Sequence, residues 1–284
     1  MRNPSMPSGR SLLPSIAFVA LAGAALTALA ASMASPSQDG AAAPPAQGSS
    51  APAIAAPPVR SPADKADART RPRTNRFLPD GIDWKAVVGP PPAPHSCEAL
   101  ADLTVVRFEQ KRRSPAEVDN AWRGVALEPV IFDQPMNARF DTENAPKIHA
   151  LLKSALVELR AVNSTLKREF GRQRPFDANP DITPVVPLED GFSYPSSHAM
   201  RGLATALLLA NIFPERRDAL LTFGKQIGYS RVVGGVHYPS DIEAAFKLAE
   251  QGVSEILSSE AWRQAVTDAS DEISQIRAIM VPIR

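Results

Sequence analysis

Cysteine is almost absent from this 284-residue chain, which contains one such residue, Cys97. A single cysteine excludes an intrachain disulfide, and it also excludes zinc sites built from paired cysteines. There are only four histidines, and aromatic residues make up 6% of the chain. Aliphatic side chains and alanine must therefore fill the core, and the surroundings of each histidine become informative.

The chain also lacks a strong excess of charge of one sign, since its formal net charge is +1. Basic residues outnumber acidic ones in residues 1–73, and the remainder of the chain is slightly acidic. No basic face for nucleic acid is predicted from this distribution. A weakly acidic body with positive charge gathered at one point would suit a small anionic substrate.

The first residues have the pattern of a signal peptide. Arg2 and Arg10 precede an apolar run from Ser11 to Ala31, and small residues follow that run. We predict a signal peptide over residues 1–34, and hence a periplasmic or secreted protein. The alternative is an uncleaved membrane anchor, because the apolar run approaches the length of a membrane span.

The next segment, residues 35–76, is rich in alanine and proline and is predicted to be a disordered linker. From residue 77 onward, apolar residues recur at spacings of three and four, which favours a single, soluble, all-α domain of antiparallel packed helices over residues 77–284. The expected helices cover 97–112, a longer segment capped by Asp141 or Thr142 with Pro146 near its first turn, Ser196 or Ser197 to Ile212, 215–233, 241–257 and 259–279.

Three clusters of polar residues stand out in this domain. The first runs from Lys167 to Pro175 and contains Lys167 and Arg174, seven residues apart. Two turns of a helix separate such residues, so the two cations are expected to point the same way, and an anion between them would stabilise the pair. The alternative is a solvated basic helix end, favoured by the helix dipole.

The second cluster is Ser193–His198, in which Ser196 and Ser197 begin a predicted helix. Hydroxyls, free backbone N–H groups and the positive end of the helix dipole make such a helix start suitable for binding an anion. His198 would lie one or two residues into the helix. The alternative is a serine N-cap beside an incidental histidine.

The third cluster is Ser230–Asp241, where Gly234-Gly235 permits a tight turn between Arg231 and His237. Asp241 lies four residues beyond His237 and could hold one imidazole nitrogen, which would make the other nitrogen a better nucleophile. The alternatives are a buried histidine satisfied by a carboxylate, or an acidic N-cap of the next helix.

Together the clusters resemble the signature of the class A bacterial nonspecific acid phosphatases, within the type 2 phosphatidic acid phosphatase superfamily. That signature is Lys-x6-Arg-Pro, then Pro-Ser-Gly-His, then Ser-Arg-x5-His-x3-Asp. The same order occurs here, and the likeness extends through much of residues 78–270. The matched residues are Lys167, Arg174, Pro175, Pro195, Ser196, His198, Ser230, Arg231, His237 and Asp241.

This resemblance implies a fold of the acid phosphatase and vanadium haloperoxidase type, with residues 77–284 as the catalytic domain. It implies a phosphoric monoester hydrolase, an acid phosphatase that uses no metal or other cofactor and forms a phosphohistidine intermediate. By resemblance, His237 attacks phosphorus, Asp241 orients His237, and His198 protonates the leaving group and then activates water.

The resemblance also assigns substrate binding to Lys167, Arg174, Ser196, Ser197 and Arg231. The expected substrates are small phosphate monoesters such as nucleotides, sugar phosphates or aryl phosphates. No nucleic-acid partner is expected, nor stable membrane insertion once the signal peptide is cleaved. A homodimer or larger homo-oligomer is compatible with the resemblance.

Ser197 departs from the family, which usually has glycine at this position, and Ala199 replaces a usual threonine. If the backbone at Ser197 needed a positive φ or a very close phosphate, its Cβ would reduce activity. Alternative functions are a vanadium-dependent haloperoxidase, whose site has the same residue pattern, and a catalytically weak phosphate-binding protein. A phosphatase acting on lysophospholipids is a further alternative.

Overall fold

The computed structural model describes residues 76–127 and 129–280. The predicted signal peptide, 1–34, and the predicted linker, except for Arg76, lie outside the described residues. Every regular element within the described ranges is a helix, so the predicted all-α fold is confirmed. Among the helices of these ranges, none is both long and apolar enough to cross a membrane.

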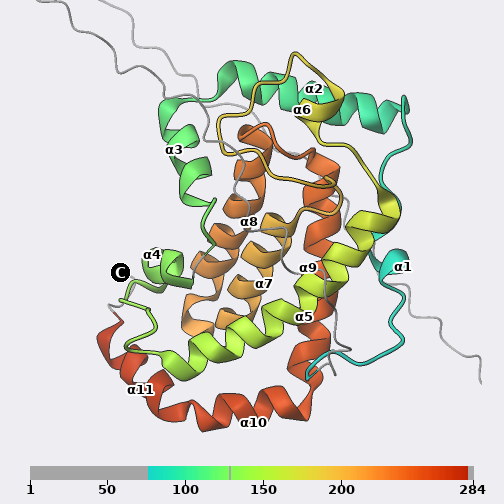
Figure 1. The fold of residues 1–284 in the computed structure, drawn as a ribbon. Helices are drawn as coiled ribbons and strands as arrows, with labels where there is room; N and C mark the ends of the chain where they lie inside the picture. Colours follow the sequence, from blue (N-terminus) through green and yellow to red (C-terminus); the bar gives the residue numbers. More distant parts are fainter. Residues whose placement is uncertain (1–75, 128, 281–284) are drawn as a thin grey trace, which may run out of the picture. The chain divides into compact units, whose positions relative to one another are not determined.

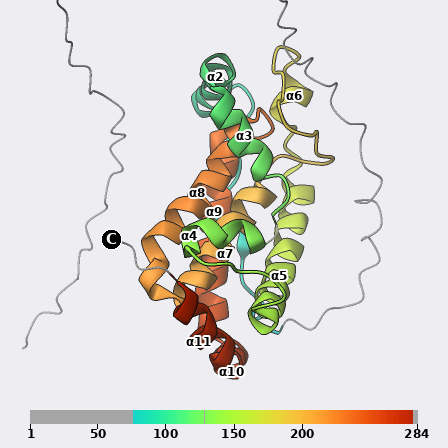
Figure 2. The same ribbon diagram turned by 90° about the vertical axis from the view of Figure 1, so that its left-hand side faces the viewer.

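The core is built around α7 (Ser197–Ile212), which packs against α8 (Arg217–Val233) and α9 (Pro239–Ser258) (Figure 1). The long helix α5 (Pro146–Phe170) crosses this core. The other elements are α1 (Trp84–Val88), α2 (Cys97–Arg112), α3 (Pro115–Arg123), α4 (Asp133–Met136), α6 (Pro175–Ala178), α10 (Glu260–Asp268), α11 (Ser270–Ile279) and the short 3-10 helices Pro129–Phe132 and Pro214–Arg216. Helices α2 and α3 lie at one end of the core, and α10 and α11 lie at the other (Figure 2).

Small residues bring α7 and α8 unusually close together. A Cβ added to Gly224 of α8 would lie 2.7 Å from the Cβ of Ala206 and 2.9 Å from the carbonyl oxygen of Gly202, both on α7. Such distances leave no room for a side chain, so glycine at this crossing is a packing requirement. The crossing fixes the start of α7 relative to the end of α8, and both of these ends carry polar clusters.

The predicted cap of the long helix is wrong. Helix α5 begins at Pro146, and the Asp141 carboxylate instead accepts the N–H groups of Glu143 and Asn144 in the preceding turn. The first N–H groups of α5 donate to Glu272, which lies 125 residues from Lys147 on α11. A carboxylate from another helix satisfies these groups as well as a local cap does, but no local pattern predicts it.

Two further expectations need correction. Residues 259–279 form two helices, α10 and α11, with the break at Ala269. The bend keeps Trp262 of α10 and Ile276 of α11 buried in the same core. Helix α9 begins at Pro239, two residues before the predicted start, because proline is favourable in the first turn of a helix.

Candidate active site

The ends of four helices meet where the three polar clusters lie. These are the C-terminal ends of α5 and α8 and the N-terminal ends of α7 and α9, all at the end of the core that α2 and α3 cover (Figure 1). Helix N-termini carry positive partial charge and free N–H groups. The N-terminal ends of α7 and α9 therefore offer N–H groups that can bind an anion, beside two C-terminal ends of opposite partial charge.

The turn between α8 and α9 places His237. Helix α8 ends at Val233, and Gly235 adopts a φ of +78° that disfavours other residues. A Cβ at Gly235 would also lie 3.3 Å from the Cα of Pro184. The Val236 N–H then donates to the Arg231 carbonyl at 3.1 Å, and the turn leaves the His237 side chain fully buried.

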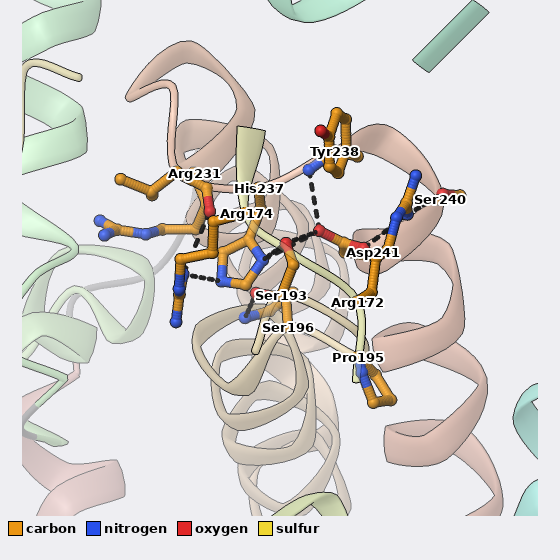
Figure 3. A network of polar contacts seen from close by, with 12 residues as sticks. Arg172, Arg174, Ser193, Pro195, Ser196, Arg231, His237, Tyr238, Ser240 and Asp241 are labelled. Atoms are coloured by element: carbon orange, nitrogen blue, oxygen red, sulfur yellow. Dashed lines mark hydrogen bonds and ion pairs between the residues drawn. The ribbon is translucent and has the colours of Figure 1, made fainter. Parts of the chain in front are cut away.

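Asp241 fixes the orientation of His237 (Figure 3). Nδ1 of His237 lies 3.1 Å from Oδ2 of Asp241, and the same oxygen accepts the N–H of Tyr238 at 2.9 Å and the hydroxyl of Ser193. Burial alone would raise the pKa of Asp241, but His237 and Arg172 lower it to about 2. The carboxylate is therefore ionised, so Nδ1 carries the imidazole proton and Nε2 is unprotonated.

The second nitrogen of His237 faces positive charge. Arg174 donates to Nε2 of His237 across 3.1 Å. Burial, followed by the charges of Arg174 and Lys167, lowers the pKa of His237 to about 3. A neutral imidazole with one fixed tautomer and an available Nε2 is the form in which histidine acts as a nucleophile.

Arg174 and Arg231 converge on one carboxylate, that of Glu189. Nη2 of Arg174 lies 2.9 Å from one of its oxygens, and Nη2 of Arg231 lies 3.0 Å from the other. Both guanidinium groups are almost completely buried. Two buried guanidinium groups that share one carboxylate show that this site accommodates an anion.

His198, the second residue of α7, lies at the same site. Its Nε2 donates to the carbonyl oxygen of Val125 at 3.2 Å, and its Nδ1 lies 3.0 Å from Glu189. Nδ1 makes no hydrogen bond in the structure, although the Glu189 carboxylate lies close to it. This arrangement leaves Nδ1 facing the anion site.

The two serines of the second cluster have different roles in the structure. Ser196 is the N-cap of α7: its hydroxyl accepts the Ala199 N–H at 3.3 Å, and its own N–H donates to the Asp241 carbonyl. Ser197 is the first residue of α7, and its hydroxyl donates to Asn163 at 2.6 Å. Among the described residues other than glycine, only His95 and Asn137 have a positive φ. The backbone at Ser197 therefore does not require glycine.

The spacing argument for Lys167 and Arg174 is wrong, because one helix does not carry both residues. Helix α5 ends at Phe170, Gly171 takes a left-handed conformation with a φ of 61°, and Arg174 follows in extended backbone. Nζ of Lys167 donates to the carbonyl oxygens of Phe192 and of Ser193, the latter at 3.1 Å. Burial and the charge of Arg174 lower the pKa of Lys167 to about 7.

Arg172 is a residue of this site that sequence reasoning left without a role. Its guanidinium donates to Asp241 Oδ1 and to Asp102 Oδ2, each at 2.7 Å, and lies 4.1 Å from the centre of the Tyr238 ring (Figure 3). It thus connects Asp241, in the first turn of α9, with α2 and packs against Tyr238, the N-cap of α9. Its position within the first cluster was the only sequence feature that could have suggested a role at the site. The structure shows that its side chain contacts Asp241.

Comparison with known proteins shows which family this part of the chain is similar to. Residues 150–251, which include every predicted site residue, match the model of the PAP2 superfamily. This part of the chain is therefore similar to the PAP2 superfamily.

Within that superfamily, the chain is similar to non-specific acid phosphatases, so the resemblance inferred from the motifs is confirmed. It is 29% identical to that of Providencia stuartii over 208 residues, which cover 69% of this chain and 83% of the relative. It is 26% identical to that of Salmonella typhimurium, over 51% of this chain and 60% of the relative. Among solved structures, a transmembrane PAP2-type phosphatidylglycerolphosphate phosphatase from Bacillus subtilis matches 66% of this chain and 92% of its own, with 19% identity and a TM-score of 0.43.

Proposed function

We propose that this protein is an acid phosphatase that hydrolyses phosphate monoesters through a phosphohistidine on His237, without a metal ion. Its similarity to non-specific acid phosphatases supports the reaction class, phosphoric monoester hydrolysis. The observation that best supports the mechanism is the unprotonated Nε2 of His237, which lies at a site that Arg174, Arg231 and His198 also face.

In the first step, Nε2 of His237 attacks phosphorus. A nitrogen–phosphorus bond forms, and the bond from phosphorus to the ester oxygen breaks. The departing oxygen takes the proton from Nδ1 of His198 and leaves as an alcohol or phenol. Asp241 holds the Nδ1 proton of His237 throughout, which stabilises the positive charge that develops on the ring.

In the second step, His198 is neutral and acts as a base. Its Nδ1 accepts a proton from water, the water oxygen bonds to phosphorus, and the nitrogen–phosphorus bond breaks. Inorganic phosphate leaves, and both histidines return to their starting states. One residue serves as the acid and then as the base because hydrolysis of the phosphohistidine approximates the reverse of its formation.

Fixed cations supply the electrostatic stabilisation that this reaction needs. A phosphoryl transition state spreads negative charge over three equatorial oxygens. Arg174 and Arg231 can each donate two N–H groups, and the start of α7 adds backbone N–H groups and a positive dipole end. These donors are already oriented and buried, so they stabilise the charge without reorganisation.

We propose small phosphate monoesters as substrates, among them nucleotides, sugar phosphates and aryl phosphates. We further propose that the protein is periplasmic or secreted, on the basis of the signal-peptide pattern over residues 1–34. Once this signal peptide is cleaved, we propose that the protein is not stably inserted in a membrane.

The first test is hydrolysis of p-nitrophenyl phosphate by the purified protein at mildly acid pH, with EDTA and then with orthovanadate. Turnover that survives EDTA and falls competitively with vanadate is the expected result. Loss of turnover in EDTA would contradict metal independence. Peroxide-dependent bromination with added vanadate would favour a haloperoxidase, and phosphate binding without turnover would favour a weak binding protein.

The pH dependence of kcat/KM tests the state of His237. The neutral imidazole is the reactive form, and a pKa lowered to about 3 keeps it neutral at every pH above that value. Activity should therefore stay level as the pH falls from about 6.5, the pKa of an ordinary histidine, to about 4. Circular dichroism at each pH controls for acid unfolding. A tenfold loss per pH unit that begins near 6.5 in folded protein would show that His237 titrates normally.

A further inference from the structure

Glu189 is an acidic residue at the centre of a site built to bind an anion. It lies between α6, which ends at Ala178, and Ser193, in a segment that forms no helix. Its carboxylate contacts Arg174 at 2.9 Å, and Arg231 and His198 at 3.0 Å each. No role in the proposed reaction requires a carboxylate in this position.

The position of this carboxylate relative to the nucleophile is the decisive feature. Oε2 of Glu189 lies 4.0 Å from Nε2 of His237, the atom proposed to attack phosphorus. The same carboxylate contacts both arginines and the proposed acid, His198. A phosphoryl group that used these partners would need the same space, so Glu189 and the substrate cannot occupy the site together.

We infer that Glu189 is an internal competitor of the substrate, whose carboxylate holds the phosphoryl position until a phosphate monoester displaces it. The inference rests on the proposed function, because it identifies the phosphoryl position from His237, Arg174, Arg231 and His198. It adds a residue that controls substrate affinity and takes no part in the chemistry.

Acid alone does not remove this competitor. Burial would raise the pKa of Glu189, but the contacts with His198 and Arg174 hold it well below the usual range for a glutamate. The carboxylate therefore stays ionised at mildly acid pH. Release requires a better anion, and a phosphate monoester can offer up to two negative charges and three oxygens to the same donors.

The local structure allows Glu189 to leave without unfolding the site. Arg174 holds the Gly191 carbonyl at 3.1 Å, and Lys167 holds the carbonyls of the next two residues, so the backbone after Glu189 is anchored. The two residues before this anchored backbone are more accessible: the Leu188 side chain is exposed, and 23% of the Glu189 side chain is exposed. Rotation of one partly exposed side chain toward solvent opens the site.

The occupied state also explains how two buried guanidinium groups are tolerated without a ligand. Removing the partner of a buried charge is destabilising, because the remaining charge is left desolvated and unpaired. Glu189 supplies that partner while the site holds no phosphate. The consequence is weaker apparent affinity, since a ligand that binds only the open state loses affinity in proportion to the closed population.

The test compares Glu189→Gln with the wild type and with Asp181→Asn. Glutamine keeps the size of the side chain and removes its charge. Asp181→Asn removes the same charge from the same segment, at a residue whose carboxylate pairs with Arg107. Two quantities are measured: KM and kcat for p-nitrophenyl phosphate, and the dissociation constant of inorganic phosphate by calorimetry.

In Glu189→Gln, KM and the dissociation constant of phosphate should both fall by about tenfold, with kcat within about twofold of wild type. Phosphate should also raise the melting temperature of this variant more than that of the wild type, because it restores a partner to the two arginines. Asp181→Asn should match the wild type in all of these.

Three results would each overturn the inference. They are an unchanged dissociation constant of phosphate in Glu189→Gln, a higher KM in that variant, or an equal gain in phosphate affinity in Asp181→Asn. A large loss of kcat in Glu189→Gln would do so too, since it would make Glu189 part of the catalytic machinery. Because phosphate binding is measured without turnover, a wild type that binds phosphate but hydrolyses nothing would refute the proposed function alone.

Discussion

Replacement of His237 by alanine should lower kcat/KM for p-nitrophenyl phosphate by about 10⁴-fold or more, because it removes the atom that attacks phosphorus. No other described side chain is placed to substitute for it: His198 faces the site through a nitrogen that must deliver a proton, and the arginines are not nucleophiles. Arg174 and Arg231 remain in the variant, so phosphate should still raise its melting temperature.

Rapid alkaline quenching of the wild type during turnover, followed by mass spectrometry, should find the phosphoryl group on residue 237. Alkaline conditions are needed because the nitrogen–phosphorus bond of phosphohistidine is cleaved in acid. His237 is fully buried, so His237→Asn serves as a second variant with a smaller loss of volume. Wild-type turnover in a folded variant of either kind would refute the assignment of the nucleophile.

Local signals in the sequence were sufficient to predict the helices that carry the site. The bounds of α2 and α7 agree with prediction because Ser96 and Ser196 are side-chain caps whose effect depends on the next few residues only. The tight turn before His237 was likewise predicted from two adjacent glycines. Such features depend on backbone conformation, which short stretches of sequence largely determine.

Contacts between distant segments could not be predicted in the same way. Glu272 caps a helix 125 residues away, and Glu189 meets Arg231 from 42 residues away. A single acidic residue in an irregular segment has no periodicity or cap pattern that would reveal its partner. Family likeness did not reveal it either, because the matched motifs contain the cations of the site and not this carboxylate.

The proton donor offers a sharper test of mechanism than the nucleophile does. His198→Ala should lower kcat/KM by about 10²–10⁴-fold for an alkyl phosphate, whose alkoxide is a poor leaving group that needs the proton from Nδ1. For p-nitrophenyl phosphate the loss should be about tenfold or less, since p-nitrophenolate leaves without protonation. The comparison uses kcat/KM because this constant reports the steps through the first phosphoryl transfer, before His198 acts as a base.

The second step should then become visible in the same variant. Without His198 to activate water, hydrolysis of the phosphohistidine slows for every substrate, so p-nitrophenyl phosphate should give a rapid burst of p-nitrophenol followed by slow turnover. His95→Asn is the matched control: His95 is exposed and has a φ of 64°, a conformation that asparagine tolerates, and its kinetics should equal those of the wild type. Equal losses of kcat/KM for the two substrates would rule out His198 as the acid. A missing burst would place the slow step before the phosphohistidine, because the burst can appear only if that intermediate forms faster than it is hydrolysed.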